Sequence, residues 1–133
     1  MSAYLAGLPA FLTYFVTGLA CYGLFIFIYT LLTPHTESRL IREGNLAAIV
    51  AFLGALLGFS LPLASAAAHS VSLIDYALWA LIGIIVQVIA FYIANFTMKD
   101  LHSKITNGDI AAGIWGGGIA IVIGILNAAC MTY

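Results

Sequence analysis

The sequence predicts an all-α membrane protein in which four transmembrane helices form a tandem repeat of two-helix units, with both termini outside. Three observations favour this fold class. Of the 133 residues, 64% are apolar and 7% are charged, whereas about a quarter of the residues in a soluble domain are charged. Four apolar runs each have roughly the 20 residues that a spanning helix needs. All four Lys and Arg residues lie in two short loops that would share one membrane face.

The four runs extend over about residues 10–32, 46–68, 76–98 and 110–131. None of them contains Asp, Glu, Lys, Arg or His. A helix satisfies its backbone hydrogen bonds within its own segment, as the hydrocarbon of a bilayer requires. Each run is therefore expected to cross the lipid bilayer once.

The basic residues predict the orientation. Arg39 and Arg42 lie in the first loop, and Lys99 and Lys104 lie in the third. The second loop, residues 69–75, and the two tails contain no Lys or Arg. Because cytoplasmic loops carry the excess of Lys and Arg, loops one and three are expected in the cytoplasm. The sequence thus predicts a multi-pass protein of the bacterial inner membrane with both termini in the periplasm.

A sequence repeat divides the chain into two units, residues 1–72 and 73–133. The segment EGNLAA at residues 43–48 recurs as NGDIAA at residues 107–112. Ile41 and Gly54 match Ile105 and Gly118 at the same offset. Both units would begin outside, so the repeat is predicted to be parallel.

The repeated loop segment favours a short helix in each cytoplasmic loop. Gly44 and Gly108 would adopt the left-handed conformation that ends a helix. Asn45 and Asp109 would then cap the following span, and Thr33-Pro34 would begin the short helix of the first loop. The alternative is that Asn45 and Asp109 bind a cation or a partner.

A few polar or helix-bending residues lie inside the predicted spans. Gln87 is at the centre of the third span, and Asn127 is in the outer part of the fourth. Such residues either bond neighbouring helices together or line a polar path. Ser60 and Pro62 are expected to loosen or kink the second span, for packing or as a gate. These four residues are the candidate intramembrane polar site.

Two pairs of glycines have the spacing of close helix contacts. Gly54 and Gly58 form one pair in the second span, and Gly113 and Gly117 form another in the fourth. Because glycine lets backbones approach closely, these residues predict tight helix packing, either within the chain or between subunits of a homo-oligomer.

Several classes of function lack support in the sequence. Nucleic-acid binding would need a basic patch to replace phosphate counterions, and none is present. His35, His69 and His102 lack the spacing of a metal site, and no cofactor motif occurs. An intramembrane hydrolase needs a base to activate its nucleophile, but no histidine or acid accompanies Ser60 or Ser65. The chain is therefore not expected to be an enzyme.

Dispersed motifs resemble one family along almost the whole chain. They are Tyr29-Thr30, Thr33-Pro34-His35, LGALLG at 53–58, PLASAA at 62–67 and NAACMT at 127–132. The sequence resembles the YjfL family of uncharacterised bacterial inner-membrane proteins, built from a two-helix domain of unknown function that is often in tandem. The resemblance implies gene neighbours that include PspA-like membrane-stress proteins and ATP-grasp ligases. It supplies no catalytic residues.

Two hypotheses of function follow. The first is a non-enzymatic membrane module, linked to envelope stress, whose cytoplasmic loops recruit a peripheral partner such as a PspA-like protein. The charged loops would bind that partner, although the same charges are equally explained as topology signals. The second is an oligomeric channel or transporter for a small solute that uses Gln87, Asn127 and the Pro62 bend.

Overall fold

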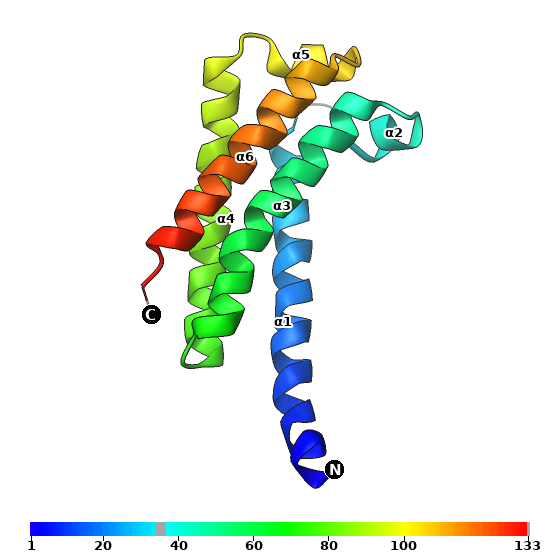
Figure 1. Ribbon diagram of the computed structural model, residues 1–133. Helices are drawn as coiled ribbons and strands as arrows, with labels where there is room; N and C mark the ends of the chain where they lie inside the picture. The colour runs from blue at the N-terminus through cyan, green and yellow to red at the C-terminus, as the bar shows by residue number, and fades with distance from the viewer. Residues whose placement is uncertain (34–36, 133) are drawn as a thin grey trace.

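A computed structural model of the protein describes residues 1–33 and 37–132, and these residues form an all-helical bundle (Figure 1). The helices are α1 (Ser2–Leu32), α2 (Glu37–Arg42), α3 (Leu46–His69), α4 (Leu73–Thr97), α5 (Leu101–Thr106) and α6 (Ile110–Cys130). Among the described residues, four helices are long and apolar enough to cross a membrane, namely α1, α3, α4 and α6. The predicted fold class is confirmed in its helices and its four spans. The repeat and the location of the termini stay predictions.

One span boundary was predicted wrongly. The first helix begins at Ser2 rather than near residue 10, and it continues through Pro9. Proline removes one backbone donor inside a helix, but the flanking residues are apolar and keep the helical conformation. At about 1.5 Å per residue, α1 is longer than the roughly 30 Å hydrocarbon core. Its first turns extend beyond the α3–α4 connection (Figure 1).

The spans are packed unequally. α3 and α6 run side by side in the same direction, and α4 packs against both of them (Figure 1). α1 packs less extensively, mainly against α3 and α4. The short helices α2 and α5 lie at the same end of the bundle, here called the α2/α5 end, and the N-terminus and the end of α6 lie away from it (Figure 1).

The buried side chains form two clusters. The larger one lies among α1, α3 and α4, where Phe25 stacks on Phe59 with ring centres 4.8 Å apart. The smaller one lies at the α2/α5 end, where Leu40, Leu101 and Ile105 pack on small residues of α3 and α6. Apolar residues on the outer sides of the spans are exposed to the bilayer region.

Local hydrogen bonds define where the spans begin. The Asn45 side chain accepts from the Ala48 backbone N–H, and the Asp109 side chain accepts from Ala111. Gly44 and Gly108 have φ values of +80° and +83°, which glycine adopts without strain. Pro34, in the predicted start of α2, lies outside the described residues.

Candidate functional site

A tight contact between α3 and α6 forms the centre of the bundle and is called here the α3–α6 seam. A Cβ atom added to Gly54 would lie 2.7 Å from the Gly117 carbonyl carbon, and one on Gly113 would lie 2.8 Å from the Ala47 Cα atom. Backbone therefore touches backbone along the seam. The glycines that the sequence analysis selected in both spans, Gly58 among them, lie between two helices of the same chain.

Pro62 has a specific consequence in the seam. Because proline has no N–H, the carbonyl of Gly58 loses its usual helical donor. This carbonyl lies against Gly124 of α6, where an added Cβ atom would be 2.8 Å from the Gly58 Cα atom. α3 remains one helix from Leu46 to His69. The sequence analysis did not select Gly124, because no neighbouring residue in the sequence links it to Pro62.

Gln87 ties α4 to this seam. Its side chain is 3% exposed, and its Nε2 atom donates to the backbone oxygen of Ala120 at 3.1 Å. A Cβ atom on Gly58 would lie 3.1 Å from the same nitrogen. Gln87, Gly58 and Ala120 thus form a junction of α4, α3 and α6.

The other intramembrane polar candidates lie elsewhere. Ser60 pairs with the Tyr22 hydroxyl, at an oxygen–oxygen distance of 2.5 Å, and donates to the Leu56 carbonyl at 2.7 Å. It therefore ties α1 to α3. The Nδ2 atom of Asn127 is buried and makes no hydrogen bond with the described residues. Gln87, Ser60 and Asn127 thus have separate surroundings.

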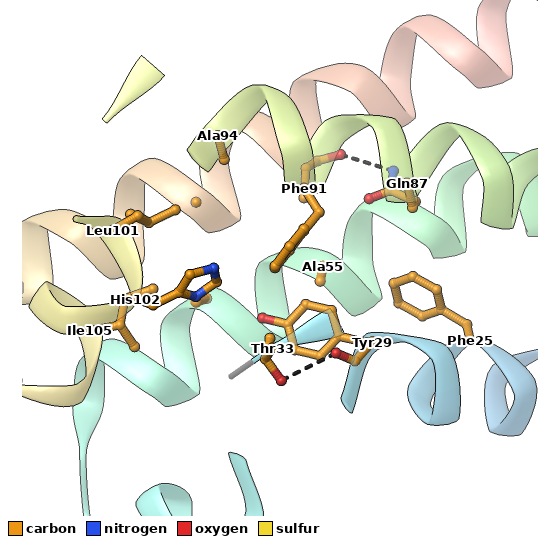
Figure 2. A pocket seen from close by; sticks show the side chains of 13 residues that line it. Phe25, Tyr29, Thr33, Ala55, Gln87, Phe91, Ala94, Leu101, His102 and Ile105 are labelled. Atoms are coloured by element: carbon orange, nitrogen blue, oxygen red, sulfur yellow. Dashed lines mark hydrogen bonds between the residues drawn. The ribbon is translucent and has the colours of Figure 1, made fainter. Parts of the chain in front are cut away.

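A small internal cavity lies between the spans and α5 (Figure 2). Its volume is about 30 Å³, and Gln87 lies at one end while His102 of α5 lies at the other. The His102 ring packs on Phe91 with ring centres 5.3 Å apart. Sequence reasoning considered His102 only as a metal ligand. The apolar residues Leu101, beside it, and Ile105, one turn later, were the sequence signal that this part of the loop packs on the bundle.

The two loops at the α2/α5 end are joined by one side chain. Asn45 Nδ2 donates to the backbone oxygens of Ile105 at 2.9 Å and of Thr106 at 3.2 Å. Its Oδ1 atom caps α3 at the same time. Asn45 therefore holds the end of α5 against the start of α3, a role that the capping prediction did not include.

The four basic residues project from this joined frame and are called here the basic end face. Arg39, Arg42, Lys99 and Lys104 are all exposed. Arg39 lies 3.9 Å from the Glu43 carboxylate, with both side chains 62% exposed, so this pair contributes little stability. Within the described residues, no three His, Cys, Asp or Glu side chains group as a metal site.

Comparisons with known proteins agree with this architecture. The sequence matches the family described as Domain of Unknown Function (DUF350) over residues 3–131. It is 45% identical to the UPF0719 inner membrane protein YjfL of Escherichia coli (strain K12), across 97% of this chain and 98% of that protein. It is 25% identical to the UPF0719 transmembrane protein YshE of Bacillus subtilis (strain 168), across 87% and 88% of the two chains. No solved structure matches the chain. The resemblance predicted from the motifs is confirmed, and the chain belongs to the DUF350 (UPF0719) family as an integral inner-membrane protein.

Proposed function

We propose that this protein is a non-enzymatic membrane module whose α2/α5 end faces the cytoplasm and binds a peripheral protein. The orientation rests on the basic end face, since Lys and Arg concentrate in cytoplasmic loops. Both termini would then be periplasmic.

The double role of Asn45 is the observation that carries the docking proposal. Charges that served only as topology signals would need no fixed arrangement. Here the side chain of Asn45 joins the two loops through 2.9 Å and 3.2 Å hydrogen bonds, and Leu40, Leu101 and Ile105 anchor both short helices in the core. A preorganised surface loses less conformational freedom on binding. The joined loops therefore support a docking role.

The proposed partner is a soluble protein that associates with the membrane surface during envelope stress. The resemblance to the YjfL family suggests a PspA-like protein as this partner. The exposed charges of this end, basic at Arg39, Arg42, Lys99 and Lys104 and acidic at Glu43, Asp100 and Asp109, would contribute electrostatic complementarity, which mainly accelerates association and selects the partner.

The test is co-purification from native membranes in mild detergent, with one loop neutralised at a time. Arg39→Gln/Arg42→Gln and Lys99→Gln/Lys104→Gln each leave two basic residues to direct topology. We expect several-fold lower recovery of one stoichiometric partner, with topology verified by a C-terminal reporter. Asp75→Asn, at the opposite end, is the matched control. Full recovery of every partner in both double variants with unchanged topology would refute the proposal.

An oligomeric small-solute channel or transporter is the second candidate, favoured by the buried amide of Asn127. Polar groups inside a span often mark a solute pathway, and the Nδ2 atom of Asn127 has no hydrogen-bond partner among the described residues. Purification as a homo-oligomer without other proteins, together with solute flux in proteoliposomes that Asn127→Leu abolishes, would support it. Flux that is unaffected by both Asn127→Leu and Gln87→Leu would exclude this pathway.

A further inference from the structure

We propose that the cavity between Gln87 and α5 is a hydration site that holds one or two water molecules inside the membrane-spanning bundle. Its volume is about 30 Å³, and a cavity needs roughly 10–15 Å³ or more to hold a water. The site does not depend on the docking function, and it would exist whether or not a partner binds.

The hydrogen-bonding capacity of Gln87 supplies the first argument. A side-chain amide has two N–H donors and an oxygen with two lone pairs. Among the described residues, the bond from Nε2 to Ala120 is the only one that this side chain makes, although the residue is only 3% exposed. Buried polar groups are normally paired with protein or ordered water. The carboxamide oxygen is directed toward the cavity in Figure 2, where a water would complete its bonding.

The opposite wall of the cavity is also polar. In Figure 2, the Tyr29 hydroxyl and the His102 ring are directed into the same region. Thr33 lies beside them and donates through Oγ1 to the Tyr29 backbone oxygen at 3.2 Å. A water needs two to four polar partners, and Gln87, Tyr29 and His102 provide them from three different helices. The water would thus connect the middle of α4 with α5 at the bundle end.

A second, larger groove in the molecule has a different lining from the small cavity beside Gln87. A groove of about 460 Å³ opens between α1 and α3 and is lined mainly by apolar side chains such as Phe15, Leu63 and Ala64. Apolar cavities tend to remain without water, and this groove opens toward the lipid. The small cavity differs because a nearly fully buried amide forms part of its wall.

The experiment is X-ray hydroxyl-radical labelling of the full protein in detergent, since radicals formed from a bound water modify the nearest side chains. Phe25 and Tyr29 line the cavity, and Phe59 and Tyr76 are also buried but do not line it. We expect several-fold faster modification of Phe25 and Tyr29 than of their matched control rings. Equal rates for the matched rings would overturn the proposal.

Two variants test whether the labelling of Phe25 and Tyr29 arises from water in this cavity. Gln87→Leu removes the polar wall, and Ala94→Val fills space at a second lining residue. Each should lower labelling of Phe25 and Tyr29 several-fold and leave Phe59 unchanged. A folded variant of either kind that keeps the wild-type labelling pattern would contradict the proposal. If neither variant folds, the wild-type comparison of matched rings decides the question.

Discussion

The α3–α6 seam and α1 are built from similar apolar residues but differ sharply in packing. In the most apolar stretch of α3, 50% of the residues are buried, whereas the corresponding value for α1 is 11%. The glycines of the seam touch opposing backbone, whereas Gly7 and Gly23 of α1 have no neighbour within 4 Å of an added Cβ atom. Hydropathy therefore identifies a span, but it does not say whether that span is the centre or the edge of a bundle.

The comparison also distinguishes the two predicted units. α3 and α6, the second spans of each unit, pair with each other, and α4 packs on both. α1, the counterpart of α4, has a more peripheral place. Without a hydrophobic driving force between helices in lipid, close packing and interhelical hydrogen bonds decide which helices pair. The seam has the close packing through its glycines, and the Gln87 hydrogen bond to Ala120 adds α4 to the pair.

The largest expected effect comes from adding bulk to the seam. Gly54→Leu would force a side chain into the Gly117 backbone, and overpacking of this kind costs about 3 kcal/mol or more where backbone must move. We expect loss of the folded bundle in an SDS-unfolding titration followed by circular dichroism. Gly23→Leu is the matched control and should be nearly neutral. Equal unfolding midpoints for the two variants would show that the seam does not hold the bundle.

Removing an aromatic ring should cost much more stability in α3 than in α1. Phe59 is fully buried against Phe25, and Phe27 of α1 is 60% exposed. Phe59→Ala should cost about 3–5 kcal/mol, in the range of buried Phe truncations. Phe27→Ala should change stability by less than about 0.5 kcal/mol, as surface substitutions do. The same unfolding titration compares them, and a large loss in Phe27→Ala would indicate that a partner helix covers α1.

Local features were predictable from the sequence, and contacts between distant segments were not. The spans, the positive φ of Gly44 and Gly108, and the capping by Asn45 and Asp109 follow from a few adjacent residues. The start of α1 was predicted too late, because the helix continues through Pro9 to Ser2.

The missed contacts share one physical cause, which is that each depends on three-dimensional packing. Gly124 matters only because the Gly58 carbonyl, freed by Pro62, lies against it. Asn45 joins the two loops only because the end of α5 comes near the start of α3. His102 reaches the cavity because α5 folds back onto the bundle. The family was recognisable because its motifs keep their order and spacing along the chain.

The two intramembrane amides should respond oppositely to the same substitution. Gln87→Leu removes the hydrogen bond to Ala120 and should cost about 1 kcal/mol, which is typical of interhelical bonds in membranes. Asn127→Leu removes an amide nitrogen without a partner among the described residues, so stability should stay unchanged or rise. Unfolding titrations of the monomeric protein measure both effects. A larger loss for Asn127→Leu would mean that its amide is paired in the folded protein, for example with a buried water.

The smallest expected effect is confined to the α2/α5 end. Asn45→Asp keeps the acceptor for the Ala48 N–H but replaces the donor to Ile105 and Thr106 with a carboxylate oxygen. Two hydrogen bonds to α5 are lost, and an anion faces carbonyl oxygens at the negative end of that helix. Because α3 remains capped and the two lost bonds are part-buried and exposed, so that water can take their place, we expect a global loss of only about 0.5–1 kcal/mol, with several-fold faster hydrogen exchange in α5. Asp109→Asn, which keeps its cap on α6, is the control. Unchanged exchange in α5 of Asn45→Asp would show that the loops are held together by the buried Leu101 and Ile105 rather than by Asn45, and the docking proposal would then rest on those two anchors.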